Sequence, residues 1–167
     1  MTVFMYIPQK QLENLKKIIT SDKVIVIYGP RRCGKTTLIK HFFDGFKEKF
    51  LFVSGEDITV QEYLGSQSIE KLKNFIGSNK LIAIDEAQRI KNIGLNLKLI
   101  VDHVDGIKII ATGSSAFDLA RAPGEPLAGR KHTLRLFPLA QMEIGGTEAR
   151  HETDARLETR LIFGSYP

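Results

Sequence analysis

Short apolar runs alternate along this chain with stretches in which apolar residues recur at helical spacing. The runs that predict strands are residues 24–28, 50–53, 81–84, 107–111 and, by alternation of apolar and polar positions, 133–137. Helical spacing predicts helices over residues 7–20, 35–43, 59–76 and 93–104. Pro8 suits the first turn of the first helix, and Gly65 interrupts the third, which is therefore one helix or two.

The later part of the chain has a weaker pattern. A short helix is expected over residues 115–120, a loop rich in Pro and Gly follows over 121–131, and residues from 139 onward are helical and polar with a break at Gly145-Gly146. We expect three parts: an N-terminal helix packed on the core (1–22), a central domain (23–140) and the helical start of a C-terminal region (141–167).

Strands that alternate with helices indicate βαβ crossovers, and hence an α/β fold with a parallel sheet covered by helices on both faces. Ligands of such sheets bind beyond the carboxyl ends of the strands. Three polar clusters follow predicted strands in this chain: residues 29–37, residues 85–86 and residues 112–115. The sequence therefore predicts one composite site made from these clusters.

The first cluster follows a buried strand and opens a helix. Gly29, Gly34, Lys35 and Thr36 fill the four fixed positions of the Walker A pattern G-x-x-x-x-G-K-[ST]. Glycines let the backbone curl around a phosphate, and the loop N–H groups and the helix N-terminus attract its negative charge. The residues predicted to bind nucleotide are Gly29, Pro30, Arg31, Arg32, Cys33, Gly34, Lys35, Thr36 and Thr37. The alternative is a glycine-rich turn with a surface lysine.

Four residues in the first two clusters have the chemistry of nucleotide hydrolysis. Lys35 is predicted to reach the β- and γ-phosphates as a point charge, and Thr36 to place its hydroxyl on Mg²⁺. Asp85 ends a buried strand as a Walker B acid does, and we predict that it holds the same Mg²⁺. Glu86 follows directly and is predicted to activate the attacking water. The alternative is that Asp85 and Glu86 are two solvated acids in a turn after the strand and have no role in hydrolysis.

Further residues are weaker candidates for contacts with the nucleotide. Ser114, with Thr112 behind it, is predicted to hydrogen-bond the γ-phosphate or the water, although a plain helix cap is an equal alternative. Arg130 lies on a Gly-flanked loop and is a candidate for stabilising transition-state charge, in cis or offered to a neighbouring subunit; a solvated loop arginine is the alternative. Arg31 and Arg32 either hold the nucleotide or form a contact surface.

Composition narrows the class of protein. A net charge of +5 and a pI near 9.3 fit a phosphate ligand and permit DNA contact without indicating it. The single Cys33 excludes an internal disulfide framework. Its place at a helix N-terminus predicts a lowered thiol pKa and reaction with an alkylating reagent. We find no signal peptide and no apolar run of membrane-spanning length, so we expect a cytoplasmic protein without a membrane partner.

Four segments together resemble a known family. They are Tyr28-Gly-Pro-Arg-Arg-Cys-Gly-Lys-Thr-Thr-Leu38, Leu81-Ile-Ala-Ile-Asp-Glu-Ala-Gln88, Ala111-Thr-Gly-Ser-Ser115 and Leu127-Ala-Gly-Arg130 with Leu136-Phe-Pro-Leu139. In this order they resemble the prokaryotic P-loop ATPases of the AAA+ class that carry a C-terminal domain of unknown function. That family more often has an apolar residue, such as Val, at the position of Cys33.

The resemblance implies a five-stranded parallel sheet of order 5-1-4-3-2, ATP with Mg²⁺, and an arginine at the position of Arg130. Residues 164–167 resemble the segment with which the family's helical C-terminal region begins, so we expect an ATPase domain taken from a longer protein.

Three functions follow as hypotheses. The first is a Mg-ATP hydrolase that couples nucleotide state to a protein partner or to the C-terminal domain, with oligomerisation possible. The second is a nucleic-acid motor of helicase type, and the third a nucleotide-binding switch with little turnover.

Overall fold

The computed structural model describes residues 6–20, 22–114, 126–145, 148 and 150–166. Its strands are β1 (Val24–Tyr28), β2 (Phe50–Ser54), β3 (Leu81–Asp85), β4 (Lys108–Gly113) and β5 (Lys131–Arg135). Its helices are α1 (Gln11–Ile18), α2 (Lys35–Phe43), α3 (Ile58–Leu64), α4 (Ile69–Ile76), α5 (Ile93–His103), α6 (Gln141–Ile144) and α7 (Arg150–Phe163), with a 3₁₀ turn, η1 (Ala87–Arg89), after β3.

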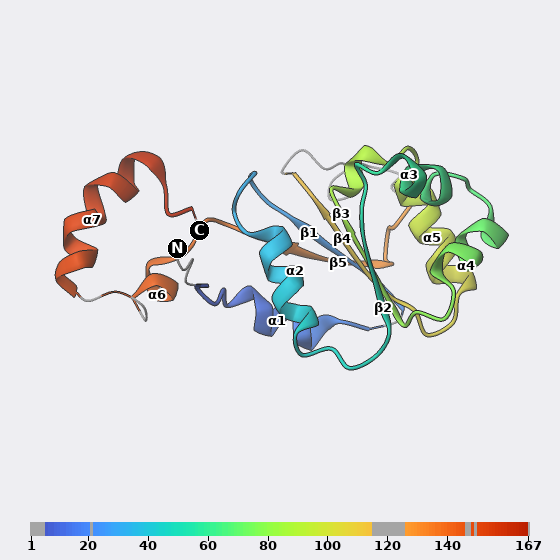
Figure 1. Cartoon of the computed structure of the whole chain (residues 1–167), viewed down its shortest axis with the longest axis horizontal. Coiled ribbons are helices and arrows are strands. Elements are labelled where there is room, and N and C mark those ends of the chain that lie inside the picture. Colours follow the sequence, from blue (N-terminus) through green and yellow to red (C-terminus); the bar gives the residue numbers. More distant parts are fainter. Residues whose placement is uncertain (1–5, 21, 115–125, 146–147, 149, 167) are drawn as a thin grey trace.

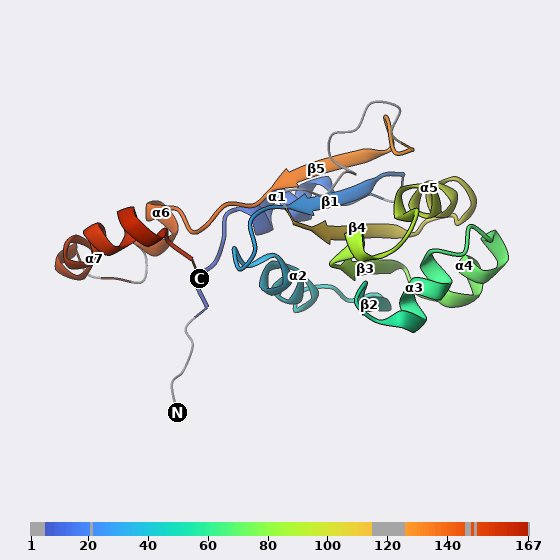
Figure 2. The same ribbon diagram turned by 90° about the horizontal axis from the view of Figure 1, so that it is seen from above.

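The five strands form one sheet in the order β2-β3-β4-β1-β5, and every neighbouring pair is parallel. This is the order 5-1-4-3-2 read from the other edge, so the α/β fold and the implied strand order are confirmed. Figure 2 shows the strands side by side with their arrowheads toward α6 and α7, so their carboxyl ends share one edge.

Successive side chains of a strand face opposite sides of the sheet, and each side has its own apolar core. On one side Val26, Ile84 and Ile109 pack with residues of α3, α4 and α5. On the other, Ile25 and Ile27 pack with residues of α1 and α2. Figure 1 shows these two groups of helices on the two faces of the sheet. The phosphate-loop segment is thus carried on a strand buried from both sides.

Several element boundaries differ from the predicted ones. The first helix begins at Gln11 rather than before Pro8, because the Gln9 side chain is tied to the loop after β1. Residues 59–76 form two helices, since Gly65 ends α3 and the Ser68 hydroxyl caps α4. The fifth strand begins two residues early, at Lys131, where Val24 already bonds to the Arg130 carbonyl. The helix predicted over residues 115–120 lies outside the described residues.

The last described segment leaves the sheet after β5 and folds back on itself. After β5 the chain runs through α6 and α7, which lie beyond the carboxyl ends of the strands (Figures 1 and 2). The N–H of Leu139 donates to the carbonyl of Ser165 at 2.7 Å, which brings the two ends of this segment together. The division of the chain into 1–22, 23–140 and 141–167 stays a prediction.

Candidate functional site

The loop between β1 and α2 has a backbone that depends on its glycines. Gly34 adopts φ +94°, in the left-handed region that glycine reaches without a steric penalty. A Cβ on Gly29 would lie 2.1 Å from the Leu136 carbonyl oxygen, so the end of β5 leaves no room for a side chain there. The nine-residue helix α2 then begins at Lys35, with its N-terminus at the loop. This is the cradle that a phosphate group requires.

Lys35 is the buried cation of the loop. Its side chain folds back so that Nζ donates to the carbonyl oxygens of Gly29 (3.0 Å) and Pro30 (2.7 Å). The residue is only 6% exposed, and the described residues offer it no carboxylate partner. A buried ammonium held only by carbonyl dipoles is a strong attractor for an anion, because its charge is not neutralised.

A chain of hydrogen bonds joins the loop to β3 and β4. Thr36 donates from Oγ1 to Oδ2 of Asp85 at 2.7 Å. The other carboxylate oxygen, Oδ1, accepts from the hydroxyl of Thr112, which in turn accepts from the N–H of Glu86 at 3.1 Å. Thr112 is fully buried, so this contact cannot be replaced by water. The two residues predicted to hold Mg²⁺, Thr36 and Asp85, are therefore in direct contact.

Glu86 lies at a strained point of the backbone. Its φ of +50° places it in the left-handed region, which costs a non-glycine residue about 1 kcal/mol. Its carboxylate Oε2 accepts from Nε2 of Gln88 at 2.5 Å. Strained residues that the surrounding contacts hold in place are frequent at functional sites.

A cleft of about 1260 Å³ opens in front of the loop. It is lined by Arg31, Arg32, Gly34, Lys35, Thr36, Thr37 and Glu86 of the predicted site, by His41, Glu56 and Arg89, and by residues of the N-terminal and C-terminal segments. Gly29 and Pro30 contribute through their carbonyls on Lys35. The structure therefore brings the phosphate loop and the two acids together, as expected from three clusters at one sheet edge.

The N-terminal segment forms one wall of the cleft. Gln9 is buried and donates from Nε2 to the Cys33 carbonyl at 2.9 Å. The Tyr6 ring stacks on His41 of α2, with ring centroids 3.4 Å apart. Burial raises the pKa of the Tyr6 hydroxyl above its ordinary value. A stacked aromatic pair and a fixed glutamine thus stand beside the phosphate loop.

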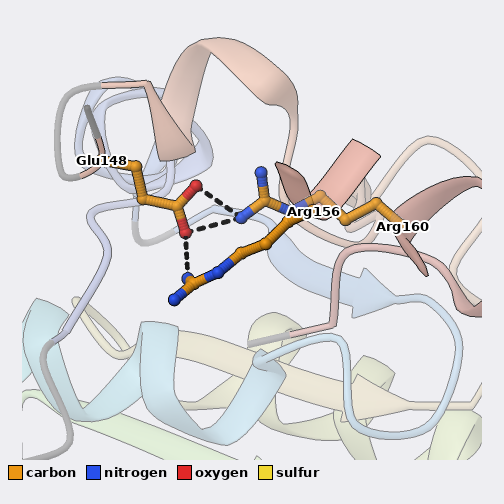
Figure 3. Close-up of polar contacts among 3 residues, drawn as sticks. All are labelled: Glu148, Arg156 and Arg160. Atoms are coloured by element: carbon orange, nitrogen blue, oxygen red, sulfur yellow. Dashed lines mark hydrogen bonds and ion pairs between the residues drawn. The ribbon is translucent and has the colours of Figure 1, made fainter. Parts of the chain in front are cut away.

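The C-terminal segment forms another part of the cleft wall, and Figure 3 shows three of its charged residues. Both oxygens of Glu148 accept from Nη2 of Arg160, each at 2.6 Å, and Oε1 also accepts from Nη1 of Arg156 at 2.7 Å. All three residues line the cleft. The hydrogen bonds from Arg160, and then those from Arg156, hold the pKa of Glu148 below its ordinary value.

The structure does not support the lowered thiol pKa predicted for Cys33. Its side chain is fully buried in the core shared by α1 and α2, and burial raises the pKa of the thiol although Lys35 acts in the opposite direction. The helix N-terminus is close in sequence, but loss of solvent outweighs its field. Cys33 contributes to the loop through its carbonyl, which accepts from Gln9.

Two of the weaker candidates lie away from the cleft. Arg130 precedes β5, at the amino edge of the sheet, where its Nε donates to Oδ1 of Asp102 at 2.8 Å. The length of β1, about 16 Å, separates it from the loop, so this arrangement does not support a role in cis. A role toward a neighbouring subunit stays a prediction. Ser114 follows β4 at the correct edge but does not line the cleft.

Sequence reasoning missed several residues of the site. Gln9, Arg156 and Arg160 are single polar residues in segments without a motif. Gln88 ends the segment Leu81–Gln88 that carries the family resemblance, but the sequence assigns it no task, and its contact with Glu86 is visible only in the structure. Thr112 was ranked behind Ser114, but Thr112 is the residue that contacts Asp85 and Glu86. Ile25 pairs with Ile110 and Ile27 with Thr112, which places the Thr112 side chain at the end of a buried row on one face of the sheet.

The parallel sheet, the glycine-dependent loop and the Thr36–Asp85 contact together define a P-loop NTPase fold. The sequence matches the family model described as "AAA domain" over residues 21–145, most of the chain. The chain therefore belongs to this AAA-domain family. No significantly similar sequence was found among curated proteins.

The fold is similar to that of a solved Signal Transduction ATPase with Numerous Domains (STAND) from Pyrococcus horikoshii, which carries a tetratricopeptide repeat sensor. The TM-score is 0.57 and the sequence identity 15%. The match covers 98% of this chain and 29% of the other, so this chain spans less than a third of that protein's length.

Mg²⁺ and nucleotide phosphates fit the residues present. Mg²⁺ takes oxygen ligands, usually one or two carboxylates together with phosphates and waters, and Thr36 and Asp85 supply such oxygens beside the loop. Among the described residues no group of three or more His, Cys, Asp or Glu side chains is arranged to hold a metal ion. The described part of the chain also contains no helix able to cross a membrane.

Proposed function

We propose that this chain binds Mg-ATP and hydrolyses it, so that the nucleotide state acts on a protein partner or on a domain that follows. The observation that carries the proposal is the contact between Thr36 and Asp85 beside a buried, unneutralised Lys35. Family membership and the fold support an ATPase module. The choice of ATP over GTP rests on the family resemblance.

The residues have separate tasks in this proposal. Lys35 exchanges its bonds with the Gly29 and Pro30 carbonyls for bonds with phosphate oxygens. Thr36 and Asp85 hold Mg²⁺, which neutralises phosphate charge when it is bound. Glu86 accepts a proton from the water whose oxygen attacks the γ-phosphorus, and the products are ADP and phosphate.

Binding is tested by thermal unfolding with and without Mg-ATP. A hundredfold excess over Kd adds about 2.7 kcal/mol, which corresponds to an increase in Tm of about 5–10 °C for a chain of this size. Each variant is compared with its own nucleotide-free form. Lys35→Ala is expected to lose the increase, and Lys40→Ala, an exposed lysine of the same helix, to keep it. No increase in the parent chain, or an equal one in Lys35→Ala, contradicts the proposal.

Hydrolysis is tested separately from binding. Glu86→Gln is expected to bind Mg-ATP normally and to release phosphate at least a hundredfold more slowly. Glu62→Gln, on the exposed side of α3, is the control. A parent chain that binds but does not turn over is instead the nucleotide-dependent switch. DNA affinity that falls steeply with salt, together with DNA-stimulated turnover, indicates the nucleic-acid motor.

A further inference from the structure

We propose that Gln88 is the positioning residue for Glu86: its side-chain amide holds one carboxylate oxygen so that the other is free for the attacking water. The inference rests on the proposed function, because it assigns a task only if Glu86 is the base. It goes beyond that function in naming a residue outside the Walker A and B positions.

The geometry of the amide is specific. Nε2 of Gln88 donates to Oε2 of Glu86 at 2.5 Å, and the described residues provide Glu86 with no ion-pair partner. An amide donates hydrogen bonds without carrying charge. It therefore restricts the rotation of the carboxylate and leaves its negative charge in place. An arginine or lysine at this position would neutralise that charge. Oε1 of Glu86 is left without a protein donor among the described residues.

The backbone on which Glu86 sits is fixed from two further sides. Its N–H donates to the buried Thr112 hydroxyl. Behind it, the N–H of Gly55 donates to the Asp85 carbonyl at 2.7 Å, and a Cβ on Gly55 would lie 2.5 Å from the Glu86 carbonyl oxygen. The main chain at Glu86 therefore has little freedom. The remaining freedom is rotation of its side chain, and that is the motion which Gln88 restricts.

The other end of the amide shows that stability does not explain this residue. Oε1 of Gln88 is buried and has no hydrogen-bond partner among the described residues. A buried carbonyl oxygen without a donor destabilises the folded state. An apolar side chain of similar length would avoid that cost. The benefit of a glutamine here is its bond with Glu86, which is the feature expected of a functional position.

The placement of the pair agrees with this task. Glu86 lines the cleft in front of the phosphate loop, together with Lys35 and Thr36. Gln88 does not line it and lies in η1, one turn after β3. It can thus act on the reaction only through Glu86, and not by binding nucleotide.

The experiment measures steady-state ATP hydrolysis by the full chain. Gln88→Met keeps an unbranched side chain and removes both polar ends. We expect kcat to fall by about 10- to 100-fold, the effect of misplacing a reacting group, with KM and the affinity for Mg-ATP changed less than threefold. Tm is expected to stay the same or rise. Gln141→Leu, an exposed glutamine of α6, is the control.

Two further variants exclude a merely structural role. Gln88→Glu has the same shape but places a carboxylate against Glu86, and kcat is expected to fall at least as far as in Gln88→Met. In a Glu86→Gln background, Gln88→Met is expected to have no further effect on kcat, because the group that it positions is gone. If Gln88→Met does not fold, Gln88→Glu and the Glu86→Gln, Gln88→Glu pair carry the same test.

The outcomes are distinct. Unchanged kcat in Gln88→Met and Gln88→Glu overturns the inference, and so does an equal loss in the Glu86→Gln background. If Glu86→Gln itself leaves kcat unchanged, or the parent chain has no turnover, the proposed function has failed instead. A loss confined to the chains that retain Glu86 supports the inference.

Discussion

The hydroxyl of Thr36 and the carboxylate of Asp85 are joined by a hydrogen bond of 2.7 Å, although 49 positions of sequence separate them. One residue begins α2 and the other ends β3, so the contact links the two sequence motifs directly. It places two oxygens of the kind that bind a divalent cation beside the phosphate loop.

Replacing Asp85 by Asn is expected to weaken the effect of Mg²⁺ on ATP affinity by about tenfold or more, because the charged ligand is lost. An asparagine oxygen still accepts from Thr36, so the loop keeps its contact with β3. The measurement is the Kd for ATP in Mg²⁺ and in EDTA. The two chains should bind ATP equally in EDTA. The same gain from Mg²⁺ in both chains would show that Asp85 is not a ligand.

Thr112→Val is expected to destabilise the fold by about 1–3 kcal/mol, since the Glu86 N–H and one Asp85 oxygen lose their buried partner. Valine has the same shape, so the loss reports the hydroxyl alone. Urea unfolding measures it, and Thr112→Ser is the control that keeps the hydroxyl. A stability equal to that of the parent would show that these hydrogen bonds contribute nothing to folding.

The Cys33 thiol is expected to react slowly with Ellman's reagent in the folded chain. It is fully buried, and its pKa is raised by that burial, so less thiolate is present at any given pH than for a free cysteine. The reaction should therefore accelerate only at a pH above the ordinary thiol pKa. The urea-unfolded chain is the reference. A folded rate within a few-fold of that reference at pH 8 would contradict the burial.

Glu148 should stabilise the fold at neutral pH and cease to do so in acid. Its pKa is lowered in the folded state by Arg160 and Arg156, so folding favours the charged carboxylate. The stabilisation is present above the ordinary glutamate pKa, about 4.3, and disappears as the pH falls through the lower folded value. The Tm deficit of Glu148→Gln should thus shrink between pH 7 and pH 3. Glu158→Gln, on the same helix, should show no such change.

Much of the fold follows from local signals. Buried strands such as residues 24–28 and 81–84 are visible as apolar runs, because each has a helix layer on both sides. The phosphate loop is visible because its backbone demands glycine at two fixed places. The strand order, by contrast, came from the family resemblance. The sequence of a buried parallel strand does not indicate which strands lie beside it.

Some expectations turn on surroundings that the sequence does not show. Arg130 precedes a parallel strand and therefore lies at the amino edge of the sheet, so its role toward a neighbouring subunit stays a prediction. Cys33 was judged from the helix N-terminus alone, whereas the core around it decides its pKa. The Glu148–Arg160 ion pair could not be predicted from the sequence, because an ion pair between a loop and a polar helix has no sequence pattern.

The bond between Leu139 and Ser165 places the two ends of the intervening segment next to each other. A segment with neighbouring ends can be exchanged for another with little strain on the chain before it. Exchange here would alter one part of the cleft wall, while the phosphate loop and the two acids, which lie before Leu139, would keep their places.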